Sequence, residues 1–170
     1  SYIGAVRQYD ELKNLMDACI GMSDVKISIY GDGVAYNRLN NIKSNYKNVI
    51  LTGKYDYTQS AKLYSETDIL YALYPTSSMQ YLISYPVKFF EAIVTNTPII
   101  VNKGTVLEDF VNKYDIGFAV EGSNVQEIRE LVKFINNDRN ILDEKVKSLN
   151  KIQNEYSWAE VARNLDKIYG

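Results

Sequence analysis

Short apolar runs alternate with amphipathic segments along most of the chain. The runs are rich in Val, Ile and Tyr and cover residues 2–6, 26–30, 49–52, 68–73, 98–101 and 117–120. Each run is mostly continuous rather than alternating in polarity, which is typical of strands buried on both faces of a parallel sheet. The pattern therefore predicts a sheet of about six parallel strands.

The segments between these runs carry apolar residues three or four positions apart, the spacing of one helix face. They are represented by Leu12, Leu15, Met16 and Cys19; Val34, Leu39 and Ile42; Ala61, Leu63 and Tyr64; residues 87–94 and 106–114; and Val125, Ile128, Leu131, Val132 and Ile135. Two further stripes lie in residues 141–152 and 158–168. Helix starts are predicted at Thr105, Ser123 and Ser157, because Glu or Gln follows each three residues later, as in a capping box.

Strand followed by helix, repeated along the chain, predicts an α/β fold with a doubly wound parallel sheet, because right-handed crossovers place helices on both faces. Extra helices follow the last strand. No long linker interrupts residues 1–170, so we expect a single domain. Ligands of such sheets bind outside the carboxyl ends of the strands, which draws attention to the loops found there.

Composition narrows the possible chemistry. The 170 residues carry a formal net charge of −2 and include no His. The chain therefore lacks a general basic surface for nucleic acid, and it lacks every His-dependent triad, dyad or metal site. Cys19 is the one cysteine, which excludes an internal disulfide, and its place on an apolar helix face favours the core. No apolar run reaches the roughly 18 residues of a membrane span. Because Ser1 directly precedes the first predicted strand, we expect a piece of a longer protein that begins at a domain boundary.

The first two strand-end loops contain candidate phosphate contacts. The first lacks the G-x-G-x-x-G of nicotinamide-binding Rossmann domains, but it holds Arg7. That side chain either binds a phosphate beside a helix N-terminus or pairs with Asp10 at the surface. The second loop contains Gly31 and Gly33, which either let a ligand approach the backbone or form a tight turn.

The third and fourth loops add aromatic and charged residues. Gly53 and Tyr55 follow the third strand and either hold a planar base or act as turn residues. The fourth loop, residues 74–86, is long enough to suggest a function and leads into a helix behind Pro86. On this helix, Lys88 is a candidate to bind phosphate, and Glu91 is a candidate to accept hydrogen bonds from sugar hydroxyls. The alternative is a local Lys–Glu pair worth a few tenths of a kcal/mol.

Residues 86–101, which contain P-x-K-x-x-E-A and end in T-P-I-I-V, resemble the donor-binding half of GT-B glycosyltransferases of the glycosyl transferases group 1 superfamily. Residues 63–69 and the Y-S-W-A-E of residues 156–160 resemble other conserved pieces in the expected order. The resemblance covers essentially the whole chain. There are departures: Ile83 stands where many members have a first glutamate, Asp10 stands where a lysine is common, and Thr97 replaces the usual Gly.

The resemblance implies roles for individual residues. Glu91 would bind the ribose of a nucleotide-sugar donor, and the amides of Val87 and Lys88 would hold its diphosphate. The base would lie near Gly53 and Tyr55, and the nucleotide would pack against the loop that contains Gly31 and Gly33. Arg7 and Lys88 would stabilise the leaving diphosphate. The donor-site residues are thus Gly31, Gly33, Gly53, Tyr55, Val87, Lys88 and Glu91.

The resemblance implies a hexosyltransferase that moves a sugar from a nucleoside diphosphate sugar to an acceptor hydroxyl, without a metal or other cofactor. The expected setting is bacterial polysaccharide synthesis in the cytoplasm, at the inner face of the membrane. An N-terminal acceptor domain would be missing, so residues 1–170 alone would be inactive. The alternatives are half of a nucleotide-sugar epimerase and a non-catalytic nucleotide-binding or docking module. The sugar, base, acceptor, stereochemistry and oligomeric state stay open.

Overall fold

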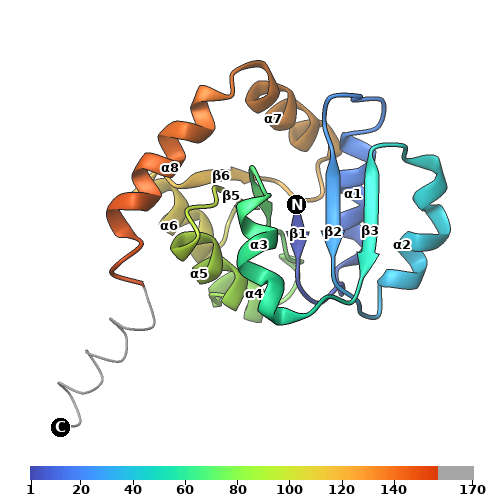
Figure 1. The fold of residues 1–170 in the computed structure, drawn as a ribbon, viewed down its shortest axis with the longest axis horizontal. Helices are drawn as coiled ribbons and strands as arrows, with labels where there is room; N and C mark the ends of the chain where they lie inside the picture. The colour runs from blue at the N-terminus through green and yellow to red at the C-terminus, as the bar shows by residue number, and fades with distance from the viewer. Residues whose placement is uncertain (157–170) are drawn as a thin grey trace, which may run out of the picture.

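A computed structural model describes residues 1–156 and shows six parallel strands in two groups of three (Figure 1). β1 (Tyr2–Ile3) pairs with β2 (Ile27–Tyr30), which pairs with β3 (Val49–Gly53). β5 (Ile99–Asn102) pairs with β4 (Leu70–Tyr71) and β6 (Gly117–Val120). The predicted parallel α/β sheet is confirmed.

The two groups of strands are joined by hydrogen bonds between β1 and β4. The nitrogen of Ser1 donates to the carbonyl of Ile69 at 2.8 Å, and the N–H of Tyr71 donates to the carbonyl of Ser1 at 2.7 Å. This staggered pair of bonds is the pattern of parallel strands. The spatial order is therefore β3-β2-β1-β4-β5-β6, which reverses direction at β1 and β4 as in a doubly wound sheet.

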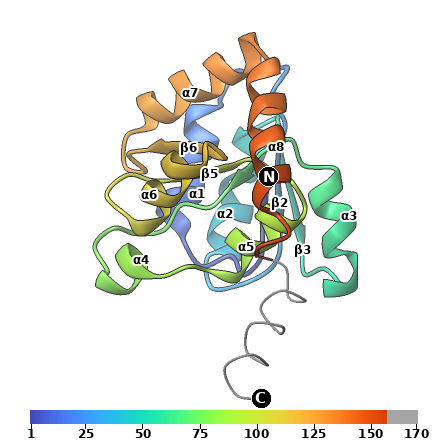
Figure 2. The same ribbon diagram turned by 90° about the vertical axis from the view of Figure 1, so that its left-hand side faces the viewer.

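Helices cover both faces of the sheet. One face is covered by α1 (Tyr9–Ala18), α2 (Tyr36–Ile42) and α7 (Val125–Asn137); the other is covered by α3 (Ser60–Ser65), α5 (Val87–Val94), α6 (Val106–Tyr114) and α8 (Asn140–Ile152). Figure 2 shows α8 beside α5. α4 (Met79–Ile83) lies in the long connection before α5, and the 3₁₀ helices η1 (Lys43–Asn45) and η2 (Tyr57–Gln59) follow α2 and precede α3.

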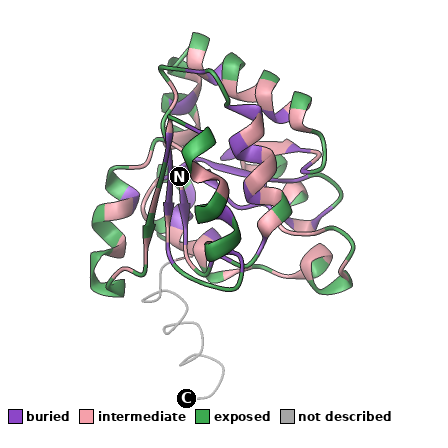
Figure 3. Ribbon diagram, turned by 90° about the vertical axis from the view of Figure 1, so that its right-hand side faces the viewer, coloured by how far each residue is buried: buried purple, intermediate pink, exposed green. Residues whose placement is uncertain are grey.

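The strands alternate between two hydrophobic clusters, one on each face. Tyr2 and Ile100 belong to the cluster under α1 and α7, whereas Ile3 and Val101 belong to the cluster under α5 and α6. Figure 3 shows the strands mostly buried and the exposed residues on loops and outer helix faces. Burial on both faces explains why the strand sequences read as continuous apolar runs. Cys19 is fully buried, as predicted.

Some predicted boundaries are wrong. The run at residues 2–6 forms a strand only over Tyr2–Ile3, because Gly4 with a φ of 128° turns the chain out of the ladder. Val34 was expected on the buried face of a helix, yet it is 84% exposed, and α2 begins at Tyr36 with Ala35 buried instead. The Ser157 helix start and the stripe at 158–168 lie outside the described residues.

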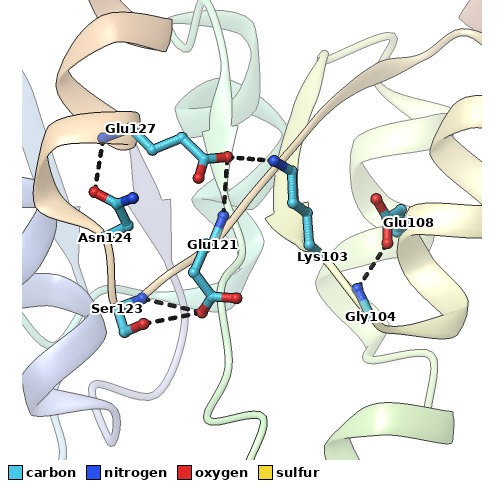
Figure 4. Close-up of polar contacts among 7 residues, drawn as sticks. All are labelled: Lys103, Gly104, Glu108, Glu121, Ser123, Asn124 and Glu127. Carbon is cyan, nitrogen blue, oxygen red and sulfur yellow. Dashed lines mark hydrogen bonds and ion pairs between the residues drawn. The ribbon is translucent and has the colours of Figure 1, made fainter.

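Figure 4 shows polar contacts at the starts of α6 and α7, among them the Asn124 cap of α7. Thr105 caps α6 as predicted, accepting a hydrogen bond from the Glu108 N–H. The predicted cap at Ser123 is wrong by one residue, because Asn124 accepts from the Glu127 N–H at 3.1 Å. The Glu127 side chain also meets Lys103 at 2.6 Å, which ties the loop after β5 to α7. Asn is as good an N-cap as Ser, so the sequence alone did not separate the two.

Within the described part of the chain, no helix combines the length and the hydrophobicity that crossing a bilayer requires.

Packing around Phe89 gives the first prediction. Phe89 is fully buried in α5 and meets Phe110 edge to face with a 5.2 Å centroid separation. Phe89→Ala should lower the free energy of unfolding by about 3–5 kcal/mol, because it removes apolar contacts and leaves a cavity. Urea denaturation followed by circular dichroism measures the change. The matched control is Phe134→Ala, at a 56% exposed position, which should change stability by no more than about 0.5 kcal/mol. Equal effects of the two substitutions would contradict the core described here.

Candidate functional site

A cavity of about 320 Å³ lies at the carboxyl ends of β1, β2 and β3. The loops that follow these strands form its wall: Gly4, Ala5, Gly31, Asp32, Lys54, Tyr55 and Tyr57. This is the sheet edge at which doubly wound folds bind ligands. Of the residues predicted for the site, Gly31 and Tyr55 line the cavity directly, and Gly53 immediately precedes Lys54.

Two glycines let the first and second loops pack together. A Cβ added at Gly31 would lie 1.9 Å from the carbonyl oxygen of Gly4, and one at Gly33 would lie 2.5 Å from the carbonyl oxygen of Val6. The Val6 N–H donates to the Asp32 carbonyl at 2.9 Å, so the two loops are held at this separation. A larger residue at either glycine would have to push the loops apart, and the wall of the cavity would change shape.

Glu91 lies on α5 and is half-buried. The hydroxyl of Tyr57, itself a residue of the cavity wall, donates to its Oε1 atom. The hydroxyl of Tyr64 donates to Oε2 at 2.9 Å. The bond to Glu91 raises the pKa of Tyr57, and burial together with Glu91 raises the pKa of Tyr64, so both side chains stay protonated donors at neutral pH. The carboxylate is therefore held between two tyrosines, one of which lines the cavity.

Pro86 immediately precedes α5 and places the start of the helix at this edge of the sheet. Val87, the first residue of the helix, is 66% exposed. The N–H groups of a helix's first turn have no acceptor within the helix, and they carry the positive end of its dipole. The amides of Val87 and Lys88 belong to this turn and suit an anion.

The Lys88 side chain packs against Tyr2 and Gly4 rather than beside the two tyrosines that contact Glu91. Its ammonium lies 3.6 Å from the centre of the Tyr2 ring, and a Cβ added at Gly4 would lie 3.3 Å from it. The nitrogen is inaccessible to solvent and has no hydrogen-bond partner in the described structure. Burial lowers the pKa of Lys88 to about 7, while the Glu91 carboxylate opposes the shift. Within residues 1–156, no ion pair joins Lys88 to Glu91, so the simple Lys–Glu pair is not formed.

Arg7 is exposed in the loop between β1 and α1. Within the described residues it forms no ion pair with Asp10 or any other carboxylate. Its guanidinium is therefore available at the sheet edge that carries the cavity.

A second cavity, of about 250 Å³, borders the amino ends of the strands. It includes Ile27 at the start of β2 and Asp68 before β4, and Asp68 pairs with Arg139 at 2.8 Å. In the part of the chain that the structure describes, no three Cys, Asp or Glu side chains converge to hold a metal ion.

Sequence reasoning did not find the role of Tyr64. The apolar spacing of α3 placed it on a buried helix face, which is correct, since it is 2% exposed. It lies 27 residues before Glu91 in the chain, and no local motif links the two. Only the packing of α3 against α5 brings its hydroxyl to the carboxylate.

Lys88 gives a prediction about pH. A lysine in the unfolded chain has a pKa near 10.5, against about 7 in the fold. Between these values the unfolded chain binds a proton that the folded chain does not, so this group's contribution to stability rises with pH across that window. Below pH 7 the buried charge costs its full penalty. Lys88→Met should therefore raise the melting temperature above wild type at pH 6, and the gain should shrink by pH 10.

Differential scanning fluorimetry at both pH values measures this gain. Lys133→Met, at an exposed position of α7, controls for the general loss of a cation. A Lys88→Met gain that is the same at pH 6 and pH 10 would contradict the buried position of the ammonium.

Comparisons with known proteins identify the family and the fold. The sequence matches the family described as "Glycosyl transferases group 1" over residues 1–155. No curated protein matches the sequence. Among solved structures, the fold is similar to HepE from Anabaena, solved in complex with UDP and glucose, with a TM-score of 0.75 and 14% identity. The similarity covers 97% of this chain and 47% of the HepE chain.

Two further structures have the same fold. Sucrose-phosphate synthase from Thermosynechococcus elongatus is 17% identical with a TM-score of 0.76, and the match covers 99% of this chain and 43% of that one. The C-terminal domain of LpcC, a glycosyl transferase group 1 family protein from Francisella tularensis, is 15% identical with a TM-score of 0.72. That match covers 92% of this chain and 85% of the LpcC domain. The chain thus spans less than half the length of the HepE and sucrose-phosphate synthase chains. It belongs to the glycosyl transferases group 1 family and has the fold of the C-terminal domain of a GT-B glycosyltransferase.

Proposed function

We propose that this chain binds a nucleoside diphosphate sugar and is the donor half of a glycosyltransferase. The observation that carries the proposal is the half-buried Glu91 carboxylate, which is hydrogen-bonded to Tyr57 of the strand-end cavity wall. A carboxylate there is an acceptor for the paired hydroxyls of a ribose. The HepE structure, which holds UDP and glucose, supports this class of ligand.

The other predicted residues have distinct roles in this proposal. The base lies against Tyr55 and the turn at Gly53, which has a positive φ. The nucleotide packs against the loop after β2, where Gly31 and Gly33 allow close contact with the loop after β1. The diphosphate meets the first amides of α5, those of Val87 and Lys88, where the helix dipole favours negative charge.

The two cations contribute unequally. Arg7 is exposed and reaches the diphosphate directly. The Lys88 ammonium is enclosed under Gly4, so it acts mainly through its positive field and its backbone amide. An anion bound nearby favours its protonated form.

The proposed reaction breaks the bond between the sugar's anomeric carbon and the diphosphate oxygen, while an acceptor hydroxyl forms a bond to the same carbon and loses its proton. The leaving diphosphate gains negative charge in the transition state. Arg7 and the α5 amides, fixed before the reaction starts, stabilise that charge. The acceptor and its proton-accepting group belong to a second domain, so we expect residues 1–170 alone to bind donor without transferring sugar. A hexosyl donor and a role in bacterial polysaccharide synthesis at the cytoplasmic face of the membrane complete the proposal.

Donor binding gives a direct test. Isothermal titration calorimetry with UDP, GDP, CMP, dTDP and their sugar conjugates should reveal one preferred nucleotide. Glu91→Gln should weaken its binding about tenfold or more, because a hydrogen bond to a charged group contributes about 1.5–3 kcal/mol.

The matched control is Glu130→Gln, an exposed position on α7 that should keep wild-type affinity. The proposal fails if no nucleotide binds to folded wild-type protein, or if Glu91→Gln and Glu130→Gln bind equally well.

A further inference from the structure

We infer that the Tyr57 hydroxyl holds the place of a donor hydroxyl on Glu91, whereas Tyr64 fixes the carboxylate for binding. The two tyrosines would then have opposite effects on donor affinity. The inference rests on the proposed function and adds a placeholder and a positioning residue to the same site.

The two hydroxyls bind different oxygens of one carboxylate. Tyr57 donates to Oε1 and Tyr64 donates to Oε2, at 2.9 Å for the latter. Tyr64 comes from α3 and Tyr57 from the 3₁₀ helix η2, which directly precedes α3. A ribose hydroxyl would donate the same kind of hydrogen bond to this carboxylate. The Tyr57 hydroxyl and the ribose of the nucleotide sugar therefore compete for Oε1 of Glu91.

Their surroundings differ sharply. Tyr64 is 2% exposed, belongs to the hydrophobic cluster under α5, and lies 3.5 Å from the Lys88 carbonyl as well. It cannot leave Glu91 without losing that packing. Tyr57 is 67% exposed and lines the cavity. Rotation of its ring into solvent breaks little more than the one hydrogen bond.

The exposed Tyr57 hydroxyl therefore stays hydrogen-bonded to Oε1 of Glu91 until a ligand hydroxyl replaces it. Each exchange trades one hydrogen bond to Glu91 for another, so binding gains less than the new bond alone would give. Removing the Tyr57 hydroxyl removes this competition. Removing the Tyr64 hydroxyl instead leaves Oε2 of Glu91 without its buried hydrogen-bond partner, so the Glu91 side chain can turn away from the ribose.

The experiment compares Tyr57→Phe, Tyr64→Phe and wild type by calorimetry. The probes are UDP or GDP, whichever binds wild type more tightly, and its 2′,3′-dideoxy counterpart. Tyr57→Phe should bind the ribonucleotide about two- to tenfold more tightly, and Tyr64→Phe about two- to tenfold more weakly. Neither variant should change the affinity for the dideoxynucleotide, which has no ribose hydroxyl to offer Glu91.

Tyr46→Phe is the matched control, because it removes a tyrosine–carboxylate bond, 2.5 Å to Asp17, outside the cavity wall. It should leave both affinities unchanged. The inference is overturned if Tyr57→Phe fails to tighten ribonucleotide binding, or if either tyrosine variant shifts the two probes equally, as a steric or purely structural role would. If Glu91→Gln still weakens binding in that case, the proposed function stands without the inference. If no nucleotide binds wild type, both fall.

Discussion

The parallel pairing of β1 with β4 determines where every loop of the site lies. Two hydrogen bonds, from Ser1 to Ile69 and from Tyr71 to Ser1, join the two groups of three strands. Because the pairing is parallel, all six strands end at one edge, and α5 begins there too. The cavity is formed by the loops after β1, β2 and β3. Glu91 lies on α5, which connects β4 to β5 in the other half of the sheet, yet it accepts a hydrogen bond from Tyr57 of the cavity wall. The site exists at the junction of the halves, which is the switch point of the fold.

Backbone crowding supplies the second constraint. The loops after β1 and β2 lie so close that no Cβ fits at Gly31 or Gly33, and the Lys88 ammonium fills the space under Gly4. This ammonium also lies 3.6 Å from the centre of the Tyr2 ring, and its burial lowers the pKa of Lys88 to about 7. The exposed Arg7 and the α5 amides provide accessible positive charge at the same edge.

The sequence predicted the sheet and its parallel sense, because strands buried on both faces leave long apolar runs. The local P-x-K-x-x-E motif singled out Glu91, whose role in donor binding stays a prediction. It failed where the local signal is ambiguous or where tertiary packing overrides it. Val34 has the right spacing for a helix face but lies before the helix, and Asn124 rather than Ser123 caps α7. Tyr64 and the course of the Lys88 side chain depend on contacts between segments distant in sequence, which periodicity does not reveal.

The location of the bound nucleotide tests this account most directly. A crystal structure of the chain with the nucleotide that calorimetry selects should show the base and ribose in the cavity at the ends of β1, β2 and β3, with a ribose hydroxyl on Glu91 and the diphosphate at the start of α5. A nucleotide bound at the other edge of the sheet, in the cavity near Ile27 and Arg139, would contradict it. So would a nucleotide in the expected cavity whose ribose does not contact Glu91.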